Sequence, residues 1–88
     1  MVSKKVTLVN KEGMHMRPAK ELVGAMGKHS CDVTIHANGK TINAKSIMNL
    51  MAAAIKCGDE IEIVCDGADE EAALSEAVAM VEAGFGEA

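Results

Sequence analysis

A histidine, an arginine and a proline stand close together near the start of the chain, in the run Gly13-Met14-His15-Met16-Arg17-Pro18-Ala19. Apolar residues alternate before this run and recur at helical spacing after it, so the run is predicted to join a strand to the first turn of a helix. The first N–H groups of a helix carry a partial positive charge that stabilises an oxyanion. The run is therefore a candidate seat for a phosphohistidine at His15, held without a metal.

Pro18 and Arg17 both suit this chemistry. Proline has no N–H and its fixed φ fits a first helical turn, which leaves the amides of Met16 and Arg17 to bind a phosphoryl group. Phosphoryl transfer requires in-line positioning and neutralisation of the charge on the equatorial oxygens. His15 is therefore predicted to be the nucleophile, with Arg17 and the two amides neutralising the phosphoryl group.

The run also resembles a known family. It matches, at all five fixed positions, the active-site pattern Gly-x-His-x-Arg-Pro-Ala of the phosphocarrier protein HPr of the sugar phosphotransferase system. A second stretch, from Lys45 to Met51, is similar to the segment around that family's regulatory serine, and Asn38-Gly39-Lys40 and Asp66-Gly67-Ala68-Asp69 also fit. The resemblance spans essentially residues 1–88, which are therefore expected to form a single HPr-like phosphocarrier domain of the Gram-positive-like type.

The resemblance implies a carrier with a transient phosphohistidine rather than a free-standing catalyst. His15 would accept the phosphoryl group from phosphorylated Enzyme I, charged from phosphoenolpyruvate, and pass it to sugar-specific Enzyme IIA domains for sugar uptake. No cofactor is implied. In Gram-positive relatives the serine at position 46 is phosphorylated by HPr kinase/phosphorylase, so this kinase and a catabolite-control transcription factor are further expected partners. The family's apolar docking patch falls here on Ile47, Met48 and Met51.

Ser46 is also predicted to have a structural role. As the N-cap of a short helix its hydroxyl can accept from the helix amides, and replacing it by alanine would cost about 1 kcal/mol. The two roles are compatible. A phosphate would add about −1.5 to −2 charges at the helix start and would repel an acidic partner surface. Phosphorylation of Ser46 is therefore predicted to slow phosphorylation of His15.

Composition limits the other possibilities. The chain has 88 residues, a net charge of −4 and Phe85 as its one Phe, Tyr or Trp residue. One small domain is expected, with neither the basic groove nor the stacking platform that nucleic acid requires. No apolar run approaches the roughly 20 residues of a membrane span, and the three cysteines form no Cys-x-x-Cys pair. We therefore expect a cytoplasmic monomer with reduced thiols at Cys31, Cys57 and Cys65.

Two features weigh on these expectations. His29, Cys31 and His36 are metal-ligand types, but their spacing is poor and His36 faces outward in the alternating pattern, so no metal site is predicted. Position 12 departs from the family, which often has a small hydroxyl or amide residue there. Glu12 would place a carboxylate near His15 and slow the approach of a phosphoryl group unless its side chain turns away or pairs with a lysine.

The elements that must position these residues can be read from periodicity. Strands are predicted around Val6 and Leu8, over 33–37, around Ile42 and over 60–65, with Asn38-Gly39 as a hairpin turn. Helices are predicted from Arg17-Pro18 to Gly27, from Ile47 to about Ala54, and from Asp69 through Val81. The order β-α-β-β-α-β-α, with alternating strands, indicates an α+β fold, an open-faced sandwich of four mostly antiparallel strands with three helices on one face. The family resemblance adds the strand order one, four, two, three.

Two other functional classes fit parts of the pattern. A regulatory module that binds a transcription factor or an enzyme would use Ser46 phosphorylation as its switch, and phosphate would enter there rather than at His15. A ferredoxin-like ligand-binding domain would share the order of strands and helices, and phosphoenolpyruvate would not label it. Retention of His15 with Arg17 favours the carrier, because neither alternative needs the nucleophile.

Overall fold

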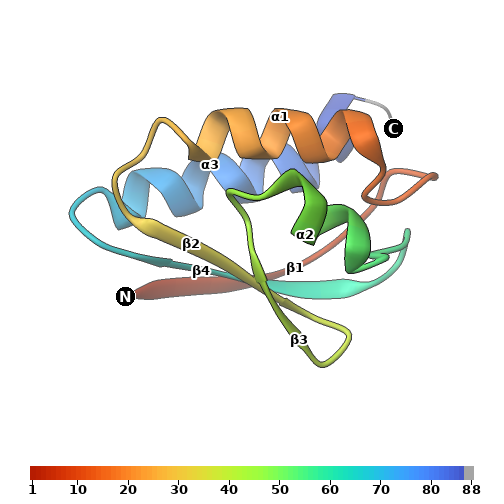
Figure 1. Ribbon diagram of the computed structural model, residues 1–88, viewed down its shortest axis with the longest axis horizontal. Helices are drawn as coiled ribbons and strands as arrows, with labels where there is room; N and C mark the ends of the chain where they lie inside the picture. Colours follow the sequence, from red (N-terminus) through yellow and green to blue (C-terminus); the bar gives the residue numbers. More distant parts are fainter. Residues whose placement is uncertain (87–88) are drawn as a thin grey trace.

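The computed structural model describes residues 1–86 and contains one sheet and three α-helices (Figure 1). In chain order the elements are β1 (Val2–Thr7), α1 (Met16–Met26), β2 (Asp32–Ala37), β3 (Lys40–Asn43), α2 (Ile47–Ala52), β4 (Glu60–Asp66), α3 (Glu70–Glu82) and a 3-10 turn, η1 (Gly84–Gly86). This is the predicted order. Among the described residues, no helix is long and apolar enough to cross a membrane.

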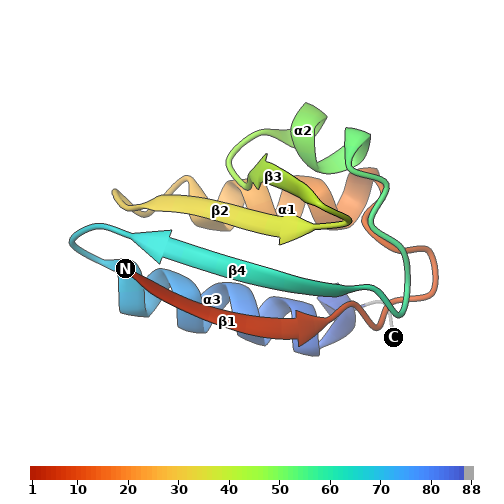
Figure 2. The ribbon, with the colours of Figure 1, turned by 90° about the horizontal axis from the view of Figure 1, so that it is seen from below.

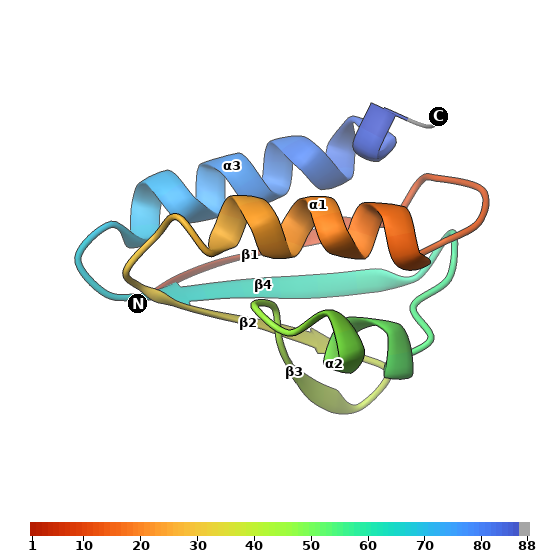
Figure 3. The ribbon, with the colours of Figure 1, turned by 45° about the horizontal axis from the view of Figure 1, so that its top comes forward.

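The four strands form an antiparallel sheet in the order β1-β4-β2-β3, as the resemblance implied (Figure 2). α1 and α3 lie side by side over one face of the sheet, and the shorter α2 lies beside α1 (Figures 1 and 3). The α+β open-faced sandwich is therefore confirmed. Because the helices cover one face alone, each strand needs an apolar residue at every second position.

The core follows that alternation. Ile35 in β2 and Ile61 and Ile63 in β4 are buried, and their neighbours along each strand are exposed or partly exposed. Leu22 of α1 and Val81 of α3 pack on them from above, both fully buried. The helical spacing predicted from the sequence thus places the buried stripes of both long helices against the sheet.

Three local details of the backbone were not foreseen from the sequence. α2 ends at Ala52 rather than near Ala54, because Ala54 adopts a positive φ of 54° that a right-handed helix cannot include. Gly27 caps α1 as predicted, but with a right-handed φ of −63°, so its conformational freedom is not used there. Phe85 turns back at φ 53° and is buried, which closes the end of α3 over the core.

Candidate functional site

His15 occupies the N-cap position of α1. Its backbone is extended, with φ −91° and ψ −169°, and its carbonyl accepts the first hydrogen bond of the helix from the Ala19 N–H at 3.1 Å. The backbone N–H groups of Met16 and Arg17 belong to the first turn of α1, where no carbonyl of the same helix can accept from them. Pro18 stands at the third helical position and is buried, so the donors of this turn come from the two residues that directly follow His15.

The partly exposed His15 ring lines a shallow surface hollow of about 430 Å³. The other lining residues are Met16, Arg17, Lys20 and Glu21. The Arg17 Nε lies 3.7 Å from a Glu21 carboxylate oxygen, with 67% and 41% of the two side chains exposed. Such an exposed pair is weakly held, so the guanidinium can leave Glu21 for a phosphoryl group at little cost.

The loop before His15 is anchored from below. Met14 is buried, and its N–H donates to the Ile55 carbonyl at 2.9 Å. Gly13 precedes it with φ 70°, and a Cβ at this position would lie 2.5 Å from the same carbonyl oxygen. Glycine is required here on both grounds, its positive φ and the close approach of backbone, so the glycine of the sequence run supports the position of the histidine.

The second predicted segment lies next to the first. α2 packs beside the half of α1 that begins at Met16 (Figure 3). The Ser46 hydroxyl caps α2 by accepting from the Asn49 N–H at 3.3 Å, as predicted. Met48 is 82% and Met51 39% exposed, whereas Ile47 is partly buried and Leu50 is fully buried. The helix therefore presents two methionines to solvent, and the helix itself lies beside the half of α1 that follows His15 (Figure 3).

The three metal-ligand types of the sequence do not come together. His29 lies between two carboxylates, with its Nδ1 2.9 Å from Asp69, the N-cap residue of α3, and its Nε2 2.7 Å from Glu76 within that helix. The hydrogen bonds to Glu76 and Asp69 raise the pKa of His29 above its ordinary value. Among residues 1–86, no group of three or more ligand side chains is arranged to hold a metal ion.

Asp69 also fixes the turn that follows α1. Its carboxylate accepts from the Cys31 N–H at 2.9 Å and from the Ser30 N–H at 3.1 Å. Although desolvation opposes the shift, the hydrogen bonds from His29, Cys31 and Ser30 hold the pKa of Asp69 well below its usual range. Lys45 donates to the His29 carbonyl at 2.8 Å, so this lysine is engaged in the fold.

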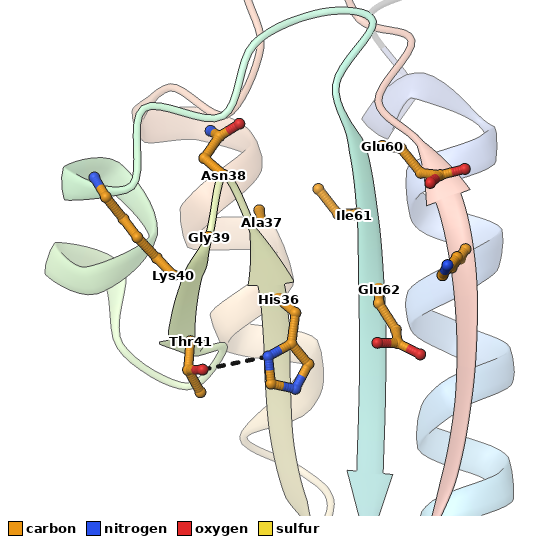
Figure 4. Close-up of a pocket in the computed structure, with 10 residues that line it drawn as sticks. His36, Ala37, Asn38, Gly39, Lys40, Thr41, Glu60, Ile61 and Glu62 are labelled. Atoms are coloured by element: carbon orange, nitrogen blue, oxygen red, sulfur yellow. Dashed lines mark hydrogen bonds between the residues drawn. The ribbon is translucent and has the colours of Figure 1, made fainter.

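A second hollow lies on the helix-free face of the sheet (Figure 4). His36 and Thr41 project into it from β2 and β3, with 3.3 Å between the His36 Nδ1 and the Thr41 Oγ1, and Glu62 stands beside them on β4. His36 faces outward, as the alternation predicted. The residues that line this hollow include no helix N-terminus that could stabilise an anion, so the hollow lacks the chemistry that distinguishes the His15 site.

The cysteines are distributed as unpaired thiols. Cys31 and Cys65 are buried and Cys57 is exposed, and all three are free. Burial raises the pKa of the Cys65 thiol to about 11, and burial likewise raises that of Cys31. The two buried thiols therefore stay protonated at neutral pH, where they behave as small core residues.

The chain matches a known protein family over most of its length. A family model described as "PTS HPr component phosphorylation site" matches residues 2–83. The chain belongs to the HPr phosphocarrier family. This family belongs to the phosphotransferase system, so family membership implies partners from that system such as Enzyme I and Enzyme IIA.

Individual HPr relatives agree with this. The phosphocarrier protein HPr of Treponema pallidum is 44% identical over 75 residues, which cover 85% of each chain. The structure of HPr-C-His from Thermoanaerobacter tengcongensis superposes with a TM-score of 0.95 at 34% identity and covers 100% of this chain and 99% of the other. Crh of Bacillus subtilis, the catabolite repression relative, matches with a TM-score of 0.76 at 38% identity over 96% and 97% of the two chains, and its structure is described as a domain-swapped dimer.

Sequence reasoning missed two parts of this arrangement. Lys20 and Glu21 line the His15 hollow, although neither was predicted as a site residue. A second missed feature is the cluster of His29, Asp69 and Glu76, which joins segments far apart in the chain and is not predicted by any local sequence pattern. Only the i, i+4 spacing of Arg17 and Glu21 was a readable signal for any of these contacts.

Proposed function

We propose that this protein carries a phosphoryl group on His15, taking it from phosphorylated Enzyme I and giving it to Enzyme IIA domains for sugar uptake. The observation that carries the proposal is the position of His15 at the start of α1, beside the backbone N–H groups of Met16 and Arg17. The lone pair of a neutral imidazole nitrogen of His15 attacks the phosphorus as the donor's P–N bond breaks. The donor phosphohistidine carries a proton on its other ring nitrogen and so leaves as neutral imidazole, while His15 keeps its own N–H and becomes a phosphoimidazolium; no proton has to enter the step and no cofactor is needed. In this proposal residues 1–88 act as one phosphocarrier domain.

Arg17 is the proposed counter-charge to the phosphoryl group. It lines the same hollow as the His15 ring and forms an exposed pair with Glu21. On phosphorylation the guanidinium exchanges the single carboxylate for phosphoryl oxygens, to which arginine donates two parallel hydrogen bonds. A carrier must also release its cargo, and an open, solvent-facing site avoids the deep energy well that would slow the onward transfer.

The methionines of α2 are the proposed docking surface for both partners. Met48 and Met51 are exposed apolar side chains on a helix that lies beside the half of α1 that follows His15, and Ile47 lies partly exposed beside them (Figure 3). Methionine is unbranched and polarisable, so it adapts to several partner surfaces. This suits a carrier that must meet a donor and several acceptors in turn.

Ser46 is the proposed regulatory site, phosphorylated by HPr kinase/phosphorylase. Its hydroxyl is partly exposed at the edge of the docking surface and makes one long hydrogen bond, to Asn49. A phosphate there places about two negative charges next to Met48, which repels an acidic partner surface and slows phosphorylation of His15. The phosphorylated form is also the proposed ligand of a catabolite-control transcription factor.

Intact-mass measurement after incubation with phosphoenolpyruvate and Enzyme I tests the central proposal, with His15→Ala alongside. We expect one added phosphoryl group that is lost in acid and is absent from the variant. No addition to the folded wild-type protein, with an Enzyme I that phosphorylates another carrier, would refute it. For the regulatory site, Ser46→Asp should accept phosphate more slowly than Ser46→Ala, and equal rates would contradict it.

A regulatory protein without carrier activity is the second candidate, favoured by the likeness to Crh. Phosphate from ATP and the kinase at Ser46, with none from Enzyme I at His15, would establish it. The cellular site proposed for either function is the cytoplasm. We propose a monomer, and sedimentation at several concentrations tests this directly against the dimer described for Crh.

A further inference from the structure

Asn10 is the only polar side chain that is fully buried among residues 1–86. It lies in the loop between β1 and α1, five residues before His15. Taking a carboxamide out of water is unfavourable unless hydrogen bonds replace those it loses. A leucine or methionine would serve a purely apolar position better, so the asparagine requires an explanation from its contacts.

Its contacts lead directly to the histidine. The Asn10 Nδ2 donates to the Gly13 carbonyl at 2.6 Å, and the Asn10 carbonyl accepts from the Gly13 N–H at 3.0 Å. The same Gly13 carbonyl accepts from the His15 N–H at 3.0 Å. One oxygen therefore receives both the Asn10 side chain and the His15 backbone, so the orientation of this carbonyl sets the position of His15.

The loop is held from the opposite side as well. The Met14 N–H donates to the Ile55 carbonyl at 2.9 Å, and the Met14 side chain is buried. This contact holds the N–H end of the Gly13–Met14 peptide. Because a trans peptide is planar, the Gly13 carbonyl of the same unit points the opposite way, where the Asn10 amide meets it. Gly13, at φ 70°, gives the backbone no side chain to restrain this peptide, so the Ile55 carbonyl and the Asn10 amide hold its two ends.

We infer that Asn10 is a positioning residue for phosphoryl transfer, holding the Gly13 carbonyl so that His15 stays aligned with the N–H groups of Met16 and Arg17. This inference rests on the proposed function of His15. In-line attack requires the nucleophile within a few tenths of an ångström of its place, and a displacement of 1 Å costs on the order of a hundredfold in rate. Removing the Nδ2 donor is therefore expected to lower the turnover of transfer about tenfold or more.

The substitutions Asn10→Ala and Asn10→Asp test this. The first removes the donor, and the second keeps the side-chain shape but places a carboxylate oxygen against the Gly13 carbonyl. Steady-state rates of phosphorylation by Enzyme I are measured against carrier concentration. We expect kcat to fall about tenfold or more with KM changed less than twofold, because the proposed docking side chains stand on α2. In Asn10→Asp the rate should recover as pH falls, since a protonated carboxyl group can donate again.

Asn43→Ala is the matched control. The Asn43 side chain also makes a local hydrogen bond to backbone, accepting from the Lys45 N–H at 2.9 Å, but in an exposed connection before α2. Its kcat should stay at the wild-type value. As a second readout, the NMR chemical shifts of the His15 ring should change in the Asn10 variants, while those of the His29 and His36 rings stay unchanged and serve as internal references.

Wild-type kcat in either folded Asn10 variant would overturn the inference, as would an equal loss in Asn43→Ala. Failure of both Asn10 variants to fold would also overturn it, because Asn10 would then serve the fold rather than the transfer. These outcomes differ from a failure of the proposed function, in which the wild-type protein itself takes no phosphoryl group from Enzyme I.

Discussion

Substituting Gly13 by alanine probes the fold where it supports the histidine. The new Cβ would lie 2.5 Å from the Ile55 carbonyl oxygen and 3.0 Å from the Lys56 Cα. Both atoms belong to backbone, so neither can swing aside as a flexible side chain would. An alanine at φ 70° also lies in the left-handed region, which costs about 1–2 kcal/mol. The unfolded chain has fewer conformations with alanine than with glycine, and this offsets about 0.4–1 kcal/mol of that cost.

The expected loss can be divided between these causes. The conformational part leaves a net destabilisation of about 1 kcal/mol. The steric part resembles insertion of a methyl group into a well-packed core, which costs about 1–3 kcal/mol. Gly13→Ala should therefore reduce the free energy of unfolding by about 2–4 kcal/mol, measured by urea denaturation with the m-value checked for constancy.

Gly39→Ala is the matched control, because Gly39 has nearly the same φ, 74°, and no heavy atom within 4 Å of an added Cβ. The Gly39→Ala substitution has the conformational cost without the steric one, so it should lower the free energy of unfolding by only about 1 kcal/mol. If the two variants lose the same free energy within about 0.5 kcal/mol, the steric argument is wrong. The close packing of Gly13 against Ile55 would then contribute nothing to stability.

Three further predictions follow from contacts described above. Ser46→Ala should lower the free energy of unfolding by about 1 kcal/mol, since it removes the N-cap of α2, and an unchanged urea midpoint would contradict the capping role. Because the pKa of His29 is raised in the folded state, the protonated ring stabilises the fold fully below the ordinary value of 6.5, and this stabilisation is lost as pH rises through the raised pKa. Thermal unfolding of the wild-type protein should show this decline in stability with pH. An equal decline in a His29→Gln variant would exclude His29 as the cause. Met48→Ala should change the free energy of unfolding by no more than about 0.5 kcal/mol and should raise KM in phosphorylation by Enzyme I, whereas Leu50→Ala should lower the free energy of unfolding by about 2–5 kcal/mol. The reverse pattern in urea titrations and transfer assays would show that the wrong side chain has been assigned to the core.

Periodicity was sufficient to predict most of the fold. The alternation around Ile35 and Ile63 and the helical spacing of Leu22 and Val81 predicted which side chains the core would contain, because one sheet face is covered and the other is open. The strand order came from the family resemblance, since spacing along a chain does not say which strands pair. The end of α2 was misplaced by two residues, because Ala54 has a strong helical preference and only its tertiary setting imposes a positive φ.

The site was predictable where it is local in sequence. The run from Gly13 to Ala19 specifies its own helix start, so His15 and the first amides of α1 could be expected together. Contacts between distant segments could not. Asn10 reads as an ordinary turn residue until Gly13 and His15 are seen to share one carbonyl, and His29 reads as a surface histidine until Asp69 and Glu76 arrive from α3.

The strand order has a consequence for how the protein is made. Of the four described strands β1 comes first in the sequence, but the strand that pairs with it is β4, which comes last of the four. The loop that carries His15 likewise needs the Ile55 carbonyl, which lies just ahead of β4. A nascent chain that stops before β4 therefore contains His15 but lacks the strand that pairs with β1. Such pairing of distant segments gives a high contact order, so folding waits on closing one long loop, and the structure that holds His15 forms late, once β4 has joined the sheet.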